Sequence, residues 1–369
     1  MSDLRTRSPV EAPAILGPLT ETRLRDAHGS PLPHPLPGTA RDRRAGTRVL
    51  AIARALPPTV VGNQEIAAPA GLTEEWIVQR TGVRERRRAA PGTCPSALGA
   101  EAARRAMAEA GVAPEELGFI LCATVTPDSP MPSTACLLQA ELGAARVPAL
   151  ELNAACSGFL YGWKVADSLM RADATMGPVL LVTTEIMSTV VDPEDPQTCA
   201  IFGDGAAAVV LGRSTPDTGL LGCTLGADGA RGRLIEIPAG GAVHPASHET
   251  VDHHDHFIHM KGREVFKLAV SEMIAECEAL LDRVGLRPED VARIIPHQAN
   301  TRILDAVGRH LGVADRIHVN ITRVGNTASA SIPLALAECV EEGSVRPGDY
   351  VLLTAFGAGL TWGAALVRW

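Results

Sequence analysis

The chain has 369 residues, with 34 Lys and Arg against 42 Asp and Glu, so its formal net charge is −8. This acidic balance argues against a nucleic-acid-binding protein, which would present a basic surface. Hydrophobic residues make up 46% of the chain, near the globular average, which argues against global disorder. The sequence contains no apolar run long enough for a membrane span and no apolar secretion signal at its N-terminus. We therefore expect a cytoplasmic protein with two domains or one large duplicated fold.

The first 46 residues differ in composition from the rest of the chain. They contain seven prolines and seven arginines, and they lack a periodic apolar pattern. The stretch 31–37, in which every second residue is proline, can form neither a helix nor a central strand. We interpret residues 1–46 as an extended N-terminal segment. It is either a solvated tail or an arm that docks on the body of the protein or on a second subunit.

From Thr47 onward, predicted strands and helices alternate. This alternation is typical of an α/β fold in which helices cover the faces of a sheet. The apolar pattern predicts strands at 48–53, 119–124, 149–152, 179–184 and 206–211, and helices at 96–110, 131–142 and 157–171.

The same pattern occurs twice along the chain. Three pairs of segments match in the same order: 111–117 with 285–291, 179–184 with 351–354, and 202–205 with 356–359. This order predicts a duplicated α/β unit whose halves are residues 47–220 and 221–369. The first half has extra residues around 186–201, and such insertions usually carry function or a subunit contact.

Among the eight scattered cysteines, Cys156 stands out by its context. No pair has the C-x-x-C spacing of a zinc site, and we expect reduced thiols rather than disulfides. Cys156 lies between a predicted strand and a predicted helix, flanked by small residues that would let a substrate approach. The helix N-terminus would favour a thiolate and lower the pKa of Cys156. The alternative is an ordinary small buried thiol.

Two polar motifs and a glycine-rich turn in the second half are further candidates. His297 follows a buried strand in the segment 294–300, where open α/β sheets place ligands, although a core histidine is the alternative. Asn326 lies in the segment 324–331, and the internal repeat predicts that Asn326–Thr327 takes the place that Cys156 has in the first half. Its alternative is a helix cap. The turn 356–363 can direct backbone N–H groups at an oxyanion.

Together these motifs resemble those of thiolase-fold condensing enzymes, specifically the β-ketoacyl-acyl-carrier-protein synthase III family. The resemblance runs from residue 47 to 369 and includes the segments 75–86 and 202–206. It implies a thiolase-like duplicated α/β fold of layered sheets and helices, in a homodimer. It also implies a catalytic triad of Cys156, His297 and Asn326.

The resemblance further implies a reaction in two halves. Cys156 takes an acyl group from a thioester, and the backbone N–H groups of Cys156 and Ala358 hold the oxyanion. A malonyl thioester then loses carbon dioxide while His297 and Asn326 donate hydrogen bonds to its oxygen. The resulting carbanion attacks the acyl group, which gives a β-ketoacyl thioester. No cofactor is bound permanently, and the substrates are thioesters of coenzyme A or of acyl carrier protein.

By the same resemblance, Trp76, Arg80 and Asn300 bind the coenzyme A and pantetheine portions of the substrate. Arg302 and Arg309 meet the acidic acyl carrier protein, and Met131 reaches into the acyl pocket of the partner subunit. Two departures weaken the case for coenzyme A as acyl donor and allow a carrier-protein donor: Pro196 replaces an arginine and Arg263 replaces an asparagine.

Several alternatives are weighed against this function. Thiolases need a second cysteine in the C-terminal turn, and 356–363 contains none, which favours decarboxylation. Chalcone-synthase-like enzymes share the triad, but the segments 74–83 and 202–205 fit synthase III better. The same fold could instead move an acyl group from Cys156 to an oxygen or nitrogen acceptor without decarboxylation, or serve as a silent scaffold. The setting is either fatty-acid initiation or specialised polyketide-type biosynthesis, and the N-terminal segment, Pro196 and Arg263 favour the second.

The histidine-rich run 244–259 suggests metal binding at first sight. Histidine is a common metal ligand, but nothing in this run predicts a ligand geometry. We therefore expect no metal site there, and a solvated loop that leads into a short strand.

Overall fold

The computed structural model describes residues 46–215 and 217–369. The predicted N-terminal segment 1–46 therefore lies outside the described residues, apart from Gly46. The strands are β1 (Thr47–Ala55), β2 (Thr59–Gly62), β3 (Glu85–Arg88), β4 (Phe119–Ala123), β5 (Ala149–Leu152), β6 (Val179–Glu185), β7 (Gly205–Arg213), β8 (Gly219–Ala227), β9 (Ile235–Glu236), β10 (His259–Met260), β11 (Arg293–Pro296), β12 (Tyr350–Gly357) and β13 (Thr361–Arg368). The helices are α1 (Asn63–Ala67), α2 (Glu74–Thr81), α3 (Pro95–Ala110), α4 (Thr134–Glu141), α5 (Gly158–Ala172), α6 (His248–Asp252), α7 (Gly262–Val284), α8 (Thr301–His310), α9 (Ile321–Val324) and α10 (Ser331–Glu341).

Two sheets carry the fold, and they share one topology. The first has the strand order β1-β7-β6-β4-β5, and the second has the order β11-β12-β13-β8. The strands β1-β7-β6-β4 of the first sheet pair as β8-β13-β12-β11 do in the second: β4 with β6 and β11 with β12 are parallel, and the other pairs are antiparallel. β5, which pairs parallel with β4, is an additional strand of the first sheet. This repeated arrangement is the duplicated α/β fold that the sequence repeat predicted.

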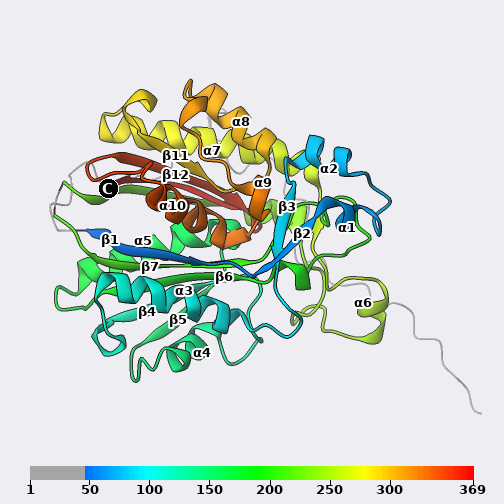
Figure 1. Cartoon of the computed structure of the whole chain (residues 1–369), viewed down its shortest axis with the longest axis horizontal. Coiled ribbons are helices and arrows are strands. Elements are labelled where there is room, and N and C mark those ends of the chain that lie inside the picture. Colours follow the sequence, from blue (N-terminus) through cyan, green and yellow to red (C-terminus); the bar gives the residue numbers. More distant parts are fainter. Residues whose placement is uncertain (1–45, 216) are drawn as a thin grey trace, which may run out of the picture. The chain divides into compact units, whose positions relative to one another are not determined.

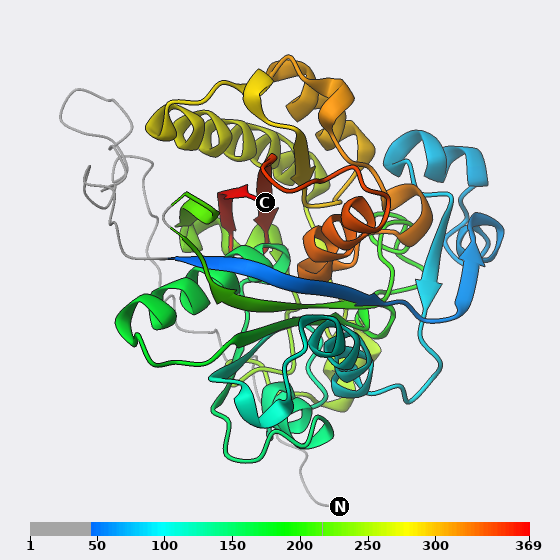
Figure 2. The same cartoon turned by 60° about the vertical axis from the view of Figure 1, so that its left-hand side comes forward.

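Helices separate the two sheets and cover their outer faces (Figure 1). α5 and α10 lie between the sheets, and their apolar side chains form one core with strands of both halves. α3 and α4 pack on the outer face of the first sheet, and α7 and α8 pack on the outer face of the second. Figure 2 shows the same order of layers from another side. The fold is therefore layered as α, β, α, β, α.

Small side chains allow the central layer to pack closely, and only 3% of the residues in the chain are aromatic. Gly162 on α5 is one example. A Cβ atom at this position would lie 2.5 Å from the end of the Leu181 side chain on β6, so any other residue would require Leu181 to move. α5 therefore lies directly on the first sheet, and Cys156 at its beginning is held near the edge of that sheet.

Most predicted elements agree with the structure, with two differences. The predicted helix 131–142 begins only at Thr134, because Pro132 precedes it and Ser133 caps its N-terminus by accepting the N–H of Cys136. β8 crosses the boundary drawn at 220 and belongs to the second sheet from Gly219 onward. No helix among the described residues 46–215 and 217–369 has the length and hydropathy that a membrane crossing requires.

Candidate active site

Cys156 lies where β5 gives way to α5. Asn153 Oδ1 accepts the N–H of Ala155 at 3.1 Å, and Ala155 takes a positive φ of 47°. A short 3-10 helix, η3 (Ala155–Ser157), then leads into α5. At Gly357, the end of β12, an added Cβ would lie 2.7 Å from the backbone nitrogen of Cys156. Glycine at 357 therefore leaves the room that the backbone of Cys156 occupies.

The surroundings of the Cys156 sulfur are apolar. Cys156 packs against a cluster formed by Met187, Ile258 and Ala328. Burial, together with the nearby carboxylate of Glu185, raises the pKa of its thiol to about 12, while a backbone hydrogen bond opposes them. The expected lowering of the Cys156 pKa is therefore wrong, because desolvation outweighs the effect of the helix N-terminus.

His297 directly follows β11 and is 2% exposed. Its backbone N–H donates to Thr354 O at 2.7 Å, which joins it to β12. Its Nδ1 lies 2.5 Å from the hydroxyl oxygen of Ser331, the first residue of α10. Burial lowers the pKa of His297 to about 3, so the imidazole is neutral at pH 7.

Asn326 follows α9 and a glycine with positive φ, Gly325. Its backbone N–H donates to Ile201 O at 2.9 Å, and its Oδ1 accepts the N–H of Ala328 at 2.8 Å. The Oδ1 is thus occupied within its own turn, and the Nδ2 is the end of the carboxamide that can serve a ligand. The 3-10 helix η8 (Ala328–Ala330) then leads into α10.

The predicted equivalence of Asn326 and Cys156 is wrong by three residues. Asn326 matches Asn153, since each side chain accepts the N–H two residues further on. The residue that matches Cys156 is Ser329, because both are the middle residue of their 3-10 helix. The sequence comparison missed this register because the two segments share few residues.

One cavity of about 950 Å³ brings the predicted catalytic residues together. Cys156, His297, Asn326 and Ala358 all line it, although they come from four segments far apart in the sequence. Met187 and other residues of the insertion 186–201 form part of its wall. The insertion in the first half therefore helps to shape the candidate site, as its position suggested.

The predicted coenzyme A residues also line this cavity. The guanidinium of Arg80 lies 5.5 Å from the ring centre of Trp76 on the same helix, α2. Asn300 caps α8: its Oδ1 accepts the N–H of Arg302, and its Nδ2 donates to Arg80 O at 2.8 Å. Asn300 thus joins α8 to α2. The two departures noted in the sequence, Pro196 and Arg263, lie in the lining of the same cavity.

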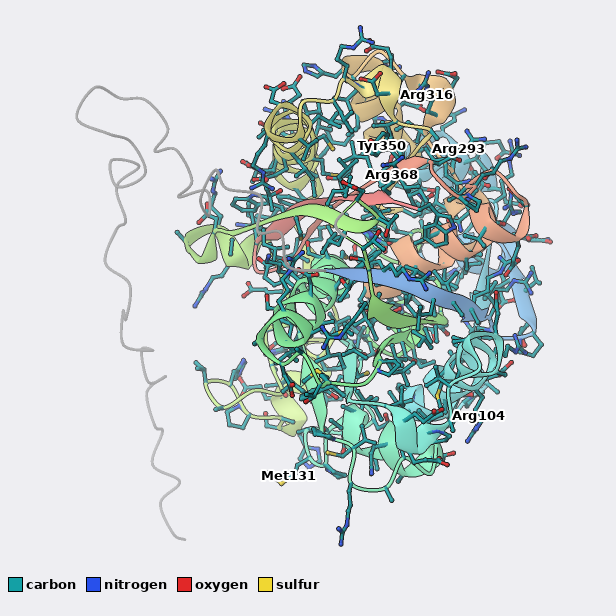
Figure 3. All side chains as sticks on the ribbon, turned by 90° about the vertical axis from the view of Figure 1, so that its left-hand side faces the viewer. Arg104, Met131, Arg293, Arg316, Tyr350 and Arg368 are labelled. Carbon is teal, nitrogen blue, oxygen red and sulfur yellow. The ribbon has the colours of Figure 1, made fainter. Side chains whose placement is uncertain are left out.

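The remaining predicted residues lie on the surface or beside the cavity. Arg302 is exposed and lines the cavity, with its guanidinium 5.5 Å from the ring centre of Phe266. Arg309 is exposed on the same helix, outside the cavity lining. Met131 is 87% exposed and does not line the cavity of its own chain. Figure 3 shows Met131 at the surface of the first half, remote from Arg293 and Arg316 of the second half.

The histidine-rich run forms α6 and the turn before β10. His254 Nδ1 lies 2.6 Å from Asp192 Oδ2, and this hydrogen bond raises the pKa of His254. The contact joins the run to the insertion 186–201. Within residues 46–215 and 217–369, no group of three His, Cys, Asp or Glu side chains is arranged to hold a metal ion.

Two buried polar residues near the site were not predicted. Glu185 ends β6 fully buried, and it accepts hydrogen bonds from Val125 N, Thr126 Oγ1 and both the N–H and hydroxyl of Ser329. Gln298 follows His297 and is also fully buried. In the sequence, Glu185 directly follows the apolar run 179–184. Buried carboxylates are rare, so an acid at the end of a buried strand was the signal that could have identified it.

Comparisons with known proteins place these observations in a family. Residues 150–229 match the family described as 3-oxoacyl-[acyl-carrier-protein (ACP)] synthase III, and residues 281–369 match its C-terminal part. The β-ketoacyl-[acyl-carrier-protein] synthase III of Roseiflexus castenholzii is 47% identical over 316 residues, which cover 85% of this chain and 96% of the relative.

Solved structures agree with the sequence relatives. The 3-oxoacyl-[acyl-carrier-protein] synthase III of Aquifex aeolicus superposes with a TM-score of 0.80 at 42% identity, covering 88% of this chain and 100% of that one. The priming β-ketosynthase of the R1128 polyketide pathway has a TM-score of 0.79 at 34% identity, covering 90% and 98%. The chain therefore belongs to the β-ketoacyl-[acyl-carrier-protein] synthase III family.

Proposed function

We propose that the protein condenses an acyl group with a malonyl thioester by the decarboxylative reaction of a β-ketoacyl-acyl-carrier-protein synthase III. The observation that carries the proposal is the meeting of Cys156, His297, Asn326 and Ala358 on one cavity. Their chemistry supplies a nucleophile, two neutral hydrogen-bond donors and a backbone N–H, which are the groups that acyl transfer and enolate formation require.

In the first half-reaction, the Cys156 sulfur attacks the carbonyl carbon of an acyl thioester. The bond from that carbon to the donor's sulfur breaks, and the proton that Cys156 loses ends on the departing thiol. The N–H groups of Cys156 and Ala358 hold the tetrahedral oxyanion, and such donors each contribute on the order of 3 kcal/mol. Burial keeps the resting Cys156 as a thiol, since its pKa is raised to about 12, so the sulfur loses its proton as it attacks.

In the second half-reaction, a malonyl thioester loses carbon dioxide and becomes an enolate. His297 Nε2–H and Asn326 Nδ2–H donate to the enolate oxygen. This role requires the His297 tautomer with the proton on Nε2, in which Nδ1 accepts a hydrogen bond from the Ser331 hydroxyl that lies 2.5 Å away. The enolate carbon attacks the acyl carbonyl, the bond to the Cys156 sulfur breaks, and a β-ketoacyl thioester leaves. The released Cys156 thiolate takes up a proton from solvent, which restores the resting thiol.

A neutral histidine suits this role. Burial lowers the pKa of His297 to about 3, so the ring donates a hydrogen bond without carrying a charge. The turn 356–363 holds no cysteine that could remove a proton from an acetyl thioester, and decarboxylation makes such a base unnecessary. These two features favour decarboxylative condensation over thiolysis.

The substrates we propose are thioesters of coenzyme A or of acyl carrier protein, bound by Trp76, Arg80 and Asn300. Arg302, and Arg309 beyond it on α8, form the proposed docking positions for an acidic carrier protein. We further propose a cytoplasmic homodimer in which Met131 completes the acyl pocket of the partner subunit. Its 87% exposure in the single chain supports this placement.

Intact mass spectrometry tests the function. The protein is incubated with a panel of acyl-coenzyme A and acyl-carrier-protein thioesters and weighed before and after a malonyl thioester is added. We expect an acyl adduct on Cys156 that the malonyl thioester discharges as a β-ketoacyl product. An adduct that only an alcohol or amine discharges would instead establish acyl transfer without decarboxylation, and the absence of any adduct would contradict both.

A further inference from the structure

Gln298 is a fully buried amide whose side chain uses all of its hydrogen-bonding capacity. Its Nε2 donates to Pro296 O at 2.9 Å and to His318 O at 3.1 Å. Its Oε1 accepts the backbone N–H of Asn320 at 2.9 Å and of Ile321 at 3.2 Å. A carboxamide has two donor hydrogens and two acceptor lone pairs, so every one of them is satisfied by backbone.

These bonds join the two segments that carry His297 and Asn326. Gln298 is the residue after His297, and its Pro296 contact fixes the backbone on either side of the histidine. The contacts to Asn320 and Ile321 hold the first turn of α9, and Asn326 follows two residues after that helix ends. This one side chain therefore connects the segments of the two donors directly, and it contributes to the distance between them.

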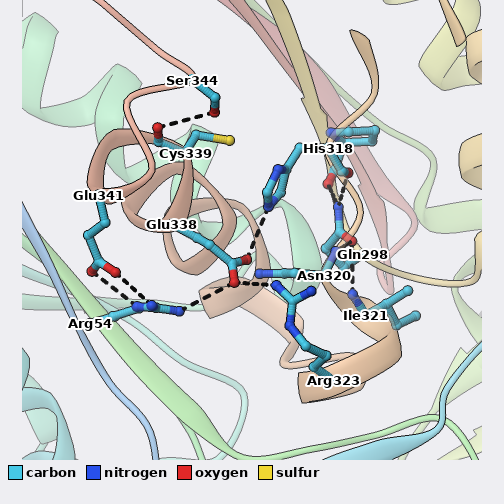
Figure 4. Close-up of polar contacts among 11 residues, drawn as sticks. Arg54, Gln298, His318, Asn320, Ile321, Arg323, Glu338, Cys339, Glu341 and Ser344 are labelled. Carbon is cyan, nitrogen blue, oxygen red and sulfur yellow. Dashed lines mark hydrogen bonds and ion pairs between the residues drawn. The ribbon is translucent and has the colours of Figure 1, made fainter. Parts of the chain in front are cut away.

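A second layer holds the far side of the same segment (Figure 4). Glu338 on α10 accepts a hydrogen bond from His318 Nε2 at 3.1 Å and pairs with Arg323 on α9. Burial disfavours the charged form of both His318 and Glu338. Hydrogen bonds to Cys339 and Glu338 nevertheless raise the pKa of His318 to about 9. Hydrogen bonds from His318 and Arg323 lower the pKa of Glu338 to about 2. The pair is therefore charged at neutral pH. It holds the segment 318–323 on the side that faces α10, and Gln298 holds the same segment on the side that faces His297.

We propose that Gln298 is a positioning residue that sets the separation of His297 and Asn326, so that both donate to the same thioester oxygen. This inference rests on the proposed function. Gln298 does not line the cavity, so it acts through its neighbours. It bears on the condensation half-reaction alone, because the oxyanion donors of acyl transfer, Cys156 and Ala358, lie on other segments.

The test uses two substitutions that remove different bonds. Gln298→Met keeps the length of the side chain and loses all of its hydrogen bonds. Gln298→Glu keeps the acceptor for Asn320 and Ile321 but, when ionised, cannot donate to Pro296 O and His318 O. The matched control is Gln139→Met, since Gln139 also donates to a backbone carbonyl, that of Ala144, but lies on α4.

The readout compares the half-reactions within each variant. Acyl loading of Cys156, followed by intact mass, counts the folded and competent sites, and single-turnover condensation is then measured per loaded site. This ratio is independent of any loss of folded protein. We expect condensation per loaded site to fall about 10- to 100-fold in both Gln298 variants, since displacements near 1 Å cost rates of this order, while loading rates change less than about threefold.

Two results would overturn the inference. One is unchanged condensation per loaded site in both variants, and the other is an equal loss in both half-reactions, which a merely structural role would produce. The Gln139→Met control should match the wild type in both. If the wild-type protein loads an acyl group but does not condense it, the proposed function itself fails, and that result is distinct from any effect of Gln298.

Discussion

The turn that carries Cys156 and the turn that carries Asn326 have the same backbone. In each, an asparagine Oδ1 accepts the N–H two residues later, and that later residue has a positive φ, 47° at Ala155 and 43° at Ala328. A 3-10 helix and then a central helix follow in both. The duplicated fold therefore builds the same junction twice, once in each half.

The difference lies in the strand end that faces each turn. The parallel pairings Phe119 with Val179 and Arg293 with Val351 place Glu185 and Gly357 at the same position of β6 and β12. Gly357 faces Cys156 and leaves space, whereas Glu185 faces Ser329 and bonds to its hydroxyl at 2.5 Å. One junction is thus open toward the cavity, and the other is filled by a buried acid. The two turns also carry different side chains, a thiol at Cys156 and a hydroxyl at Ser329, so the thiol lies at the junction that the glycine leaves open.

The largest expected effect follows from removing the nucleophile of the open junction. Cys156→Ala should abolish acyl loading and lower condensation by at least about 10³-fold, because no other group at the cavity replaces the thiol. Rates of acyl loading by intact mass measure this. Cys94→Ala, which removes an exposed thiol, is the matched control and should load normally. Persistent loading in Cys156→Ala would place the nucleophile elsewhere.

Filling the open junction should be the next largest effect. Gly357→Ala places a Cβ 2.7 Å from the backbone nitrogen of Cys156, so η3 must shift and carry the oxyanion donor with it. We expect the rate of acyl loading to fall about 10²-fold. Gly62→Ala is the control, since a Cβ there meets no atom within 4 Å. Equal rates in the two variants would show that the room at Gly357 is unimportant.

The junction at Ser329, which Glu185 fills, should make the unfolding free energy of the protein depend on pH. Burial raises the pKa of Glu185 from 4.5 to about 7, although hydrogen bonds from Ser329 and Val125 oppose it. The folded state therefore binds more protons than the unfolded state between pH 4.5 and 7, so stability falls as the pH rises through this window. Relative to Glu185→Gln, the wild type should lose on the order of 2–3 kcal/mol between pH 5 and pH 8.

Urea unfolding of both proteins at several pH values measures this difference. Glu185→Gln removes the titration, and its NH2 group also disturbs hydrogen bonds that a carboxylate oxygen accepts. The second effect lowers stability at every pH alike, so the stability curve of the variant should lack the fall between pH 5 and 7. Cys156 and Cys122 are the titratable groups that sense the charge of Glu185, and both remain thiols over this range because burial raises their pKa values. Parallel curves for the two proteins would contradict the assignment.

The smallest effect is expected at Ser329, the counterpart of Cys156. Ser329→Ala removes a hydrogen bond to a buried carboxylate, which should cost about 1–3 kcal/mol of unfolding free energy. Acyl loading should stay within about threefold of the wild type, because Ser329 does not line the cavity. A loss of loading comparable to that of Gly357→Ala would mean that the two junctions are not functionally distinct.

Local sequence patterns determined much of the fold and the identity of the candidate residues. Apolar runs marked the strands 119–124 and 179–184, and the internal repeat predicted two α/β units with one topology. Cys156, His297 and Asn326 were found because each interrupts or follows a buried run with polar or small residues. Such patterns are local, so a single sequence reveals them.

Only the tertiary structure decided the electrostatics and the support of the site. The pKa of Cys156 rises because its sulfur is buried beside Glu185, a residue 29 positions further along the chain. The proposed role of Gln298 depends on its hydrogen bonds to backbone groups near residue 320. The equivalent strand pairings of the two halves support the match between Ser329 and Cys156. Burial and long-range hydrogen bonds depend on which distant segments come into contact in the folded chain. Local sequence patterns do not reveal those contacts.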